Sequence, residues 1–262
     1  MEWDKGPDDA LARLFEQAPL GEYKEIPEKF RLEWGPIYYR GRTDGSARVL
    51  IIGQDPAADE NIARRILVGT AGRRVQGFLG KLGITRSYVM VNSVLYSIYG
   101  QFDQTMRAFM ERPGVATWRH ALLDAVATSG LEAIIAFGQA ARHAVETWPG
   151  GASLAAQGKI FYLMHPTARP EAAVLEDWSN NLPLIGAMVT PDADGEVDLA
   201  RYAGKKFGKA DLMRIPLRDF SFGVPQWSGS GDNAVRLTPG KPLPAFLQDK
   251  TAIAWVPSGS EG

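Results

Sequence analysis

The sequence predicts an α/β protein, a three-layer αβα sandwich with a central, mostly parallel four-stranded sheet and a C-terminal extension. Two observations support this prediction: short apolar runs alternate with helical stretches, and each run ends in glycine or a polar residue. The predicted strands lie at residues 47–53 (ARVLIIG), 87–94 (SYVMVNSV), 131–138 (LEAIIAFG) and 159–165 (KIFYLMH). Strands that alternate with helices form parallel sheets, whose ligands bind beyond the carboxyl ends of the strands.

Helical patterns fill the segments around these strands. Residues 8–18 follow an Asp cap, and residues 116–128 and 139–148 have the same periodicity. The stretch 72–83 (GRRVQGFLGKLG) directs four apolar side chains inward, namely Val75, Phe78, Leu79 and Leu82. Each helical stretch is therefore expected to cover one face of the sheet.

The composition changes near residue 190. We predict that residues 1–190 form the αβα domain and that residues 191–262 form a Pro- and Gly-rich extension packed on it. Aromatic residues persist in this extension, which favours an ordered, wrapping segment: Phe220, Phe222, Trp227, Phe246 and Trp255. Packing is the favoured role of Trp227 and Trp255, and stacking on DNA bases is the alternative.

The absence of cysteine excludes disulfides, thiolate zinc sites, iron–sulfur clusters and cysteine nucleophiles. With three histidines, a histidine-built metal site is not expected either, so we predict no metal and no cofactor. No apolar run approaches the ~18 residues of a membrane span. Because the acidic start MEWDKGPDDA has no signal-peptide pattern, we expect a cytoplasmic protein.

The net charge of −1 gives no general sign of nucleic-acid binding, but the charge is unevenly distributed. Residues 61–90 contain six basic residues and no acidic ones. This segment includes Arg64, Arg65, Arg73 and Arg74. These four arginines either contact phosphates or form a solvated helix face, and both alternatives stay open.

Polar side chains follow three of the predicted strands. Asp55 lies in GQDP after the first, Asn92 lies near the end of the second, and His165 lies at the end of the fourth, where HPTARP begins. Alone, each has an ordinary explanation: a turn-forming Asp, an Asn that ends a strand, or a capped turn. Their joint occurrence at strand ends is the informative feature, because parallel strands bring these ends to one edge of the sheet.

These motifs together resemble the uracil-DNA glycosylase superfamily over about residues 47–169. GQDP matches the first motif of the best-known uracil-excising family, with Asp55 at its water-positioning Asp. The longer run GQDPAADENIARRILVGTAG is similar to the iron–sulfur families, and Asn92 and His165 match the base-reading Asn and the second-motif His. The resemblance implies an αβα fold and excision of uracil from DNA.

The sequence departs from the family pattern at four points. The cluster cysteines of the iron–sulfur families are absent, so that cofactor is excluded. Ala57 stands where a tyrosine blocks thymine, and Leu67 stands where an aromatic ring stacks on uracil. Ala168 and Arg169 replace the intercalating leucine.

The resemblance also implies a role for each matched residue. Asp55 orients water and stabilises the sugar cation, while His165 donates a hydrogen bond to uracil O2. Asn92 reads O4 and N3–H. The other expected base-pocket residues are Gln54, Leu67 and Ala57, and Ala168 and Arg169 are expected to face the DNA.

We therefore expect a monofunctional uracil-DNA glycosylase, monomeric and nucleoid-associated, which acts on uracil in single- or double-stranded DNA. It would leave an abasic site and so initiate base excision repair. One alternative is a mismatch-type glycosylase for uracil or thymine opposite guanine. The other is a non-catalytic or covalently trapping binder of uracil-DNA. The absence of a histidine after Arg73 and Arg74 disfavours trapping.

Overall fold

The computed structural model describes residues 4, 6–220, 234–236 and 255–257. Its helices and strands, in chain order, are α1 (Asp9–Glu16), α2 (Leu20–Lys24), η1 (Pro27–Lys29), η2 (Leu32–Trp34), β1 (Tyr39–Gly41), β2 (Val49–Gly53), α3 (Ala58–Ala63), α4 (Thr70–Lys81), β3 (Tyr88–Asn92), α5 (Gln104–Met110), α6 (Pro113–Val126), β4 (Ala133–Phe137), α7 (Gly138–Glu146), α8 (Gly151–Ala156), β5 (Ile160–Leu163), α9 (Glu171–Gly186), η3 (Lys209–Asp211), η4 (Leu217–Asp219), β6 (Ala234–Arg236) and β7 (Trp255–Pro257). Strands β6 and β7 pair with each other as a separate two-stranded sheet.

The main sheet has the strand order β1-β3-β2-β4-β5. Strand β2 pairs in parallel with β3 and β4, and β4 pairs in parallel with β5. All four predicted strands are confirmed. The expected strand count was wrong by one, because β1 adds an antiparallel fifth strand beside β3. Strand β1 is only three residues long and carries Arg40 at its centre, so it lacks the apolar run that marks a buried strand.

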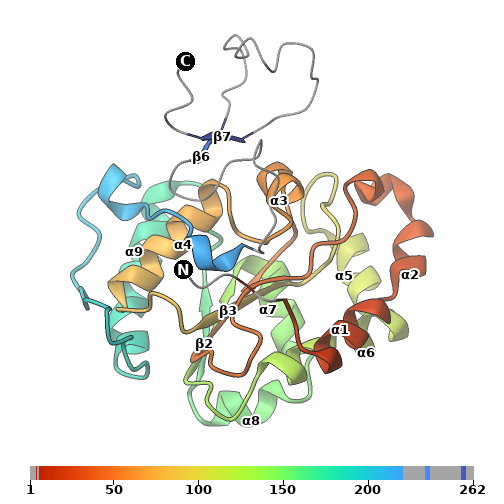
Figure 1. Ribbon diagram of the computed structural model, residues 1–262, viewed down its shortest axis with the longest axis horizontal. Coiled ribbons are helices and arrows are strands. Elements are labelled where there is room, and N and C mark those ends of the chain that lie inside the picture. The colour runs from red at the N-terminus through yellow and green to blue at the C-terminus, as the bar shows by residue number, and fades with distance from the viewer. Residues whose placement is uncertain (1–3, 5, 221–233, 237–254, 258–262) are drawn as a thin grey trace.

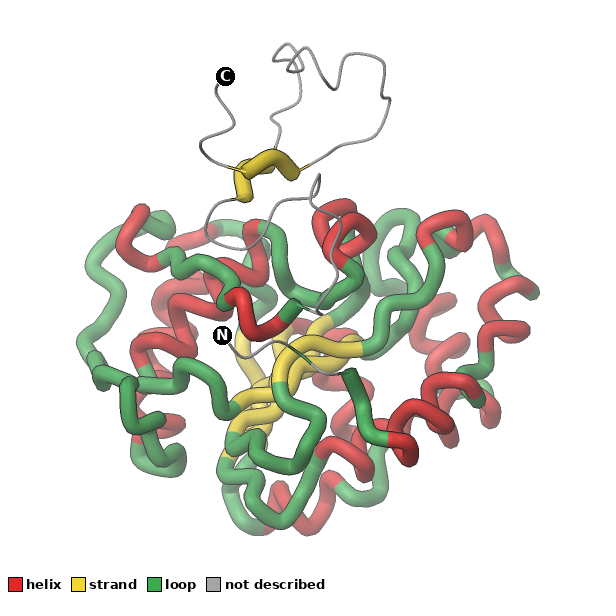
Figure 2. Tube along the Cα trace, viewed as in Figure 1, coloured by secondary structure: helices red, strands yellow, loops and turns green. Residues whose placement is uncertain are grey.

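The predicted three-layer αβα sandwich is confirmed, with helices on both faces of the sheet (Figure 1). Alternate side chains of each strand point to opposite faces. In β2, Leu50 and Ile52 pack into one hydrophobic cluster with side chains of α1, α5, α6 and α7. Val49 and Ile51 pack into a second cluster with side chains of α4 and α9. Figure 2 shows the strands between these two helical layers.

The first residues of α1 and the buried face of α4 agree with the sequence patterns that predicted these helices. Helix α1 begins after Asp8, whose carboxylate accepts a hydrogen bond from the Leu11 N–H at 2.8 Å. Helix α4 begins after Gly69 and buries three of its predicted inward residues, Val75, Phe78 and Leu79. Both predicted helices are confirmed.

Residues 191–220 contact the α4 side of the domain through buried carboxylates. Asp192 accepts hydrogen bonds from the N–H groups of Thr85, Arg86 and Ser87 at 2.8, 2.9 and 3.1 Å. Although burial raises it, the Ser87 hydroxyl and these N–H groups lower the pKa of Asp192 to about 2. Phe222, Trp227 and Phe246 lie outside the described residues, and Trp255 is described only as part of β7. The predicted packing of the whole extension stays a prediction.

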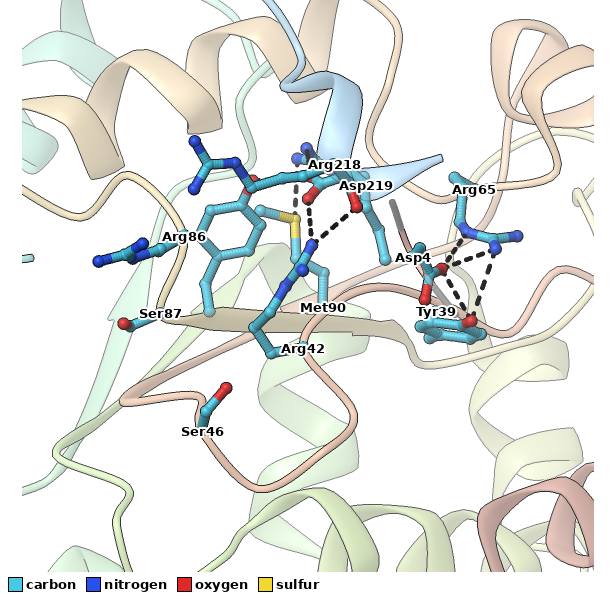
Figure 3. A network of polar contacts seen from close by, with 12 residues as sticks. Asp4, Tyr39, Arg42, Ser46, Arg65, Arg86, Ser87, Met90, Arg218 and Asp219 are labelled. Atoms are coloured by element: carbon cyan, nitrogen blue, oxygen red, sulfur yellow. Dashed lines mark hydrogen bonds and ion pairs between the residues drawn. The ribbon is translucent and has the colours of Figure 1, made fainter. Parts of the chain in front are cut away.

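A buried ion-pair cluster attaches Asp219 to the edge of the sheet (Figure 3). Asp219 and Arg40 are both 0% exposed, and Asp219 Oδ2 lies 2.7 Å from Arg40 Nη1. Arg42 donates to Asp219 Oδ1 at 2.9 Å, and the Tyr88 hydroxyl donates to Oδ2 at 2.7 Å. The partners of Asp219 all come from β1, β3 and the residue that follows β1. Both oxygens of the Asp219 carboxylate therefore have hydrogen-bond partners in the αβα domain.

The N-terminal segment lies beside the same cluster. The Asp4 N–H donates to the carbonyl of Phe220 at 3.0 Å. The Asp4 carboxylate accepts from the Tyr39 hydroxyl at 2.9 Å and pairs with Arg65 at 2.7 Å. Asp4 and Phe220, which are far apart in the sequence, therefore meet beside β1.

We expect Asp219→Ala to lower the free energy of unfolding by about 3–5 kcal/mol, because it leaves Arg40 as a buried charge without a carboxylate. Urea unfolding of the full chain measures this change. The matched control is Asp198→Asn, which removes an exposed pair with Lys81 and should change stability by less than about 1 kcal/mol. Equal effects of the two substitutions would show that the Arg40–Asp219 pair does not stabilise the sheet edge.

Candidate functional site

The carboxyl ends of the parallel strands place the predicted site residues at one edge of the sheet. In the β2–β3 register, Gly53 lies opposite Asn92. In the β4–β5 register, Phe137 lies opposite Leu163. Asp55 follows β2 by two residues, and His165 follows β5 by two residues. Asn92 is therefore the last residue of β3, and short loops after β2 and β5 carry Asp55 and His165 at the same edge.

Asp55 is held by two hydrogen bonds. Its Oδ1 accepts from Gln54 Nε2 at 3.0 Å, and its Oδ2 accepts from the Ile98 N–H at 3.0 Å. Burial raises the pKa of Asp55 to about 6, against the opposing effect of these two hydrogen bonds. The group is thus an oriented carboxylate at neutral pH and a proton acceptor of moderate strength.

Asn92 presents a buried amide without protein partners. The residue is 4% exposed, and neither Oδ1 nor Nδ2 has a hydrogen-bond partner within the described part of the chain. A Cβ on Gly53 would collide with Asn92 Oδ1, so the glycine makes room for this side chain. Buried polar groups are almost always paired, and an unpaired one costs about 1–3 kcal/mol. This amide is therefore a donor–acceptor pair available to a ligand.

The contacts of His165 define its tautomer. Its Nδ1 accepts a hydrogen bond from the Thr167 N–H at 3.3 Å and lies 3.0 Å from Thr167 Oγ1. An Nδ1 that accepts from a backbone N–H carries no proton, so the neutral ring is protonated on Nε2. Burial lowers the pKa of His165 below its usual value, which also favours the neutral ring. His165 is therefore a neutral Nε2–H donor.

The backbone at Gly138 approaches His165 so closely that only glycine fits there. Gly138 has φ +84°, in the left-handed region, and a Cβ there would lie 3.1 Å from His165 Cβ. The start of α7 can therefore approach the second motif closely only with glycine at this position.

Leu67 adjoins the amide of Asn92. It has φ +53° and is 8% exposed, and its Cδ1 would lie 3.7 Å from a Cβ placed on Gly53. A left-handed leucine is unusual and costs about 1–3 kcal/mol, so its surroundings must hold it in this conformation. Leu67 is therefore a buried aliphatic side chain, and its contact with a base stays a prediction. Ala57, the fourth expected pocket residue, is exposed and directly precedes α3 as its N-cap.

Glu60 fixes the loop that contains Leu67, and the sequence analysis did not identify it. The side chain is buried and accepts three backbone hydrogen bonds. Its Oε2 accepts from the Ala57 N–H at 3.1 Å, and its Oε1 accepts from Val68 and Gly69 at 2.8 and 3.1 Å. One carboxylate thus ties the first motif to the segment after Leu67. The acidic pair Asp59-Glu60 directly after the motif was the available signal.

The predicted DNA-contacting arginines have different surroundings. Arg74 is 9% exposed, donates to the Pro166 carbonyl at 2.7 Å and pairs with Glu171 at 2.9 Å. Arg74 fits neither of the two expected surroundings, phosphate or solvated helix face. It is buried, and both of its partners belong to or follow the second motif. The arginine expected to replace the wedge leucine, Arg169, is highly exposed and pairs with Glu171 at 2.6 Å.

The remaining arginines of the basic segment differ in accessibility. Arg65 pairs with Asp4. Arg64 donates to the carbonyls of Trp34 and Pro36 at 2.6 and 2.7 Å. Arg73 is exposed. Phosphate binding by Arg64, Arg65 and Arg73 stays a prediction.

The described residues contain no group of three or more His, Asp or Glu side chains that could hold a metal ion. Within the same residues, no helix combines the length and the apolar character needed to cross a membrane.

The αβα fold carries a buried amide, a neutral imidazole and a carboxylate at or just beyond the ends of its parallel strands. A model of the Uracil DNA glycosylase superfamily matches residues 40–176, more than half of the chain. The chain belongs to this superfamily. No curated protein matches the sequence. Membership supports a uracil- or DNA-glycosylase-type function and binding of DNA, and Asp55, Asn92 and His165 all lie within the matched residues.

We expect the ring of His165 to be neutral and protonated on Nε2 at pH 7, because the Thr167 N–H occupies Nδ1. Two-dimensional ¹⁵N NMR of the histidine side chains identifies the protonated nitrogen. Thr167→Val is the control, since it keeps the N–H donor and should keep the tautomer. A proton on Nδ1 in the unmodified protein would contradict the assignment.

Proposed function

We propose that the protein is a monofunctional uracil-DNA glycosylase, which flips uracil out of DNA, hydrolyses its N-glycosidic bond and initiates base excision repair. The observation that carries the proposal is the buried, unpaired amide of Asn92 beside the loops of Asp55 and His165. A base within a duplex is inaccessible, so extrusion precedes cleavage. The extruded uracil would supply the hydrogen bonds that Asn92 lacks.

The chemistry follows from the charge that develops. The bond between C1′ and N1 breaks with its electron pair on uracil, so the sugar becomes cationic and the base anionic. The Asp55 carboxylate stabilises the sugar cation and orients a water, whose oxygen bonds to C1′ and whose proton passes to Asp55. The Nε2–H of His165 donates to uracil O2 and stabilises the leaving anion, and a neutral imidazole suffices for this role.

Base selection rests on the Asn92 amide. Uracil offers an acceptor at O4 and a donor at N3–H, and cytosine offers the opposite pair. A hydrogen-bonding site of this kind discriminates by ~10⁴ or more, whereas rejection of one methyl by shape contributes only about 1–3 kcal/mol. Cytosine should therefore be rejected more strongly than thymine.

One observation favours a second candidate, the mismatch-type glycosylase. Ala57 is small and exposed at the position of the thymine-blocking tyrosine, so the structure shows no bulky side chain there. Strict dependence on an opposing guanine and little single-strand activity would identify this alternative. Covalent trapping is not favoured, because Val75 and Gln76, which follow Arg73 and Arg74, are buried and neither is a nucleophile.

The test is incubation of the full chain with single- and double-stranded oligonucleotides that contain one uracil, followed by alkaline cleavage of abasic sites. Asp55→Asn should lower the single-turnover rate by ~10² or more while uracil-DNA binding survives. Because the pKa of Asp55 is raised to about 6, its carboxylate forms as pH rises through that value. The wild-type rate should rise through about pH 6 and level off above it, and the variant should lose this dependence.

Asp44→Asn is the matched control, since Asp44 is an exposed carboxylate in the loop before β2, and Asp55 follows the other end of that strand. It should keep both the rate and the pH profile. Full activity of Asp55→Asn would remove Asp55 from the mechanism.

Asn92→Asp should lose uracil excision and gain measurable cytosine excision. Burial favours the protonated carboxyl group, whose oxygen accepts from the cytosine amino group while its hydroxyl donates to N3. The gain should be largest for cytosine in single strands, where flipping costs least. Oligonucleotides with one uracil or one unpaired cytosine measure both changes, and Asn180→Asp on the exposed face of α9 is the control. Wild-type uracil excision by Asn92→Asp would show that another residue reads the base.

A further inference from the structure

An open groove lies directly after the second motif. Its cavity has a volume of about 490 Å³ and is lined by Arg169, Pro170, Glu171, Ala172, Lys205 and Lys206. Four of these residues come from the end of the second motif and the start of α9. Lys205 and Lys206 come from the C-terminal segment, beyond the residues that the superfamily model matches.

Anchors on both sides hold the lysines at the groove. The Tyr202 N–H donates to Ser179 Oγ at 3.1 Å, and the Phe207 N–H donates to Glu171 Oε2 at 3.2 Å. The Phe207 ring packs against Trp178, with 5.3 Å between ring centroids, and lies 4.2 Å from the Arg74 guanidinium carbon. The short segment between Tyr202 and Phe207 therefore has its two ends fixed to α9.

The positive charges of Lys205 and Lys206 in this groove have no described carboxylate as a partner. Lys205 and Lys206 are exposed, and neither forms an ion pair with any described residue. Among the described residues that line the groove, Glu171 is the only carboxylate. It already pairs with Arg74 and Arg169, and the hydrogen bond from Arg74 lowers its pKa below the usual value. Two lysines therefore remain available to an anion.

We propose that Lys205 and Lys206, together with Arg169, bind the phosphate backbone of DNA beside the flipped nucleotide. The inference rests on the proposed function, because it takes DNA as the ligand of the neighbouring pocket. Arg169 is four residues from His165, so a strand whose base reaches His165 passes this groove with its adjacent phosphates. Lysine contacts to phosphate carry no sequence information, which suits an enzyme that finds one base in any context.

This site gives the C-terminal segment a binding role. The sequence lacks the wedge leucine at the end of the second motif, and the groove places three cations around that position. Phosphate contacts on one flank hold the strand in register while the base leaves the stack.

The test compares Lys205→Gln/Lys206→Gln with wild type on a uracil-free duplex over a range of salt concentrations. Each neutralised phosphate contributes about 0.9 to the slope of log Kobs against log[salt], so the double variant should reduce the slope by about 1.8. The affinity at low salt should fall by ~10-fold or more. The control is Arg13→Gln/Lys24→Gln, which removes two exposed cations from α1 and α2, on the opposite side of the molecule (Figure 1). This control should keep the wild-type slope.

Equal slopes for the double variant and wild type would overturn the inference, as would the absence of DNA binding by wild type at low salt. Single-turnover excision at saturating enzyme distinguishes this outcome from failure of the proposed function. Uracil excision by wild type together with equal slopes would overturn the phosphate site alone and leave the proposed function standing. If wild type excises no uracil but the slopes differ, the proposed function fails and the phosphate site stands.

Discussion

The parallel pairing of β2 with both β3 and β4 is the constraint on which the rest of the structure depends. Parallel neighbours need a helical crossover between them, so both faces of the sheet are covered and the strands are apolar throughout. Val49 to Ile52 accordingly contribute to both hydrophobic clusters. Polar chemistry is then confined to the residues at and just beyond the carboxyl ends. Asn92 is at such an end, and Asp55 and His165 each lie two residues beyond one.

The loops at this edge are fixed by buried charge in addition to apolar packing. The Glu60 carboxylate accepts hydrogen bonds from three backbone N–H groups and so connects Ala57 to Val68 and Gly69. Arg74 does the equivalent for the second motif, because it bonds to the Pro166 carbonyl and to Glu171 at the start of α9. A site that must stabilise a transient cation and anion gains most when its dipoles are held before the substrate arrives. Glu60 and Arg74 are positioning residues in this sense, although neither carries the proposed chemistry.

The fold and the strand-end residues could be predicted from the sequence because both depend on local patterns. Apolar runs that end in Gly or Asn identify β2, β3 and β4, and periodicity identifies α1 and α4. Strand β1 could not be found in this way, since its buried Arg40 is neutralised by Asp219, 179 residues further along the chain. The arginines were ambiguous for the same reason. Arg74 resembles a phosphate ligand until its partner Glu171, 97 residues away, is known.

The superfamily match ends at residue 176, yet buried groups of the matched domain have their partners further along the chain. A domain cut after α9 would bury Arg40 in the sheet without its carboxylate, and it would lose the Asp192 contacts that cap the start of β3. Residues 191–220 therefore complete the electrostatics of the sheet edge on which β3 and Asn92 depend. The same segment passes beside the second motif through Phe207, whose ring packs on the arginine that holds that motif. The contacts of Tyr202 and Phe207 with α9 hold this segment beside the second motif whether or not DNA is bound. The exposed cations between them, Lys205 and Lys206, are then in a position to contact the DNA that the proposed function requires.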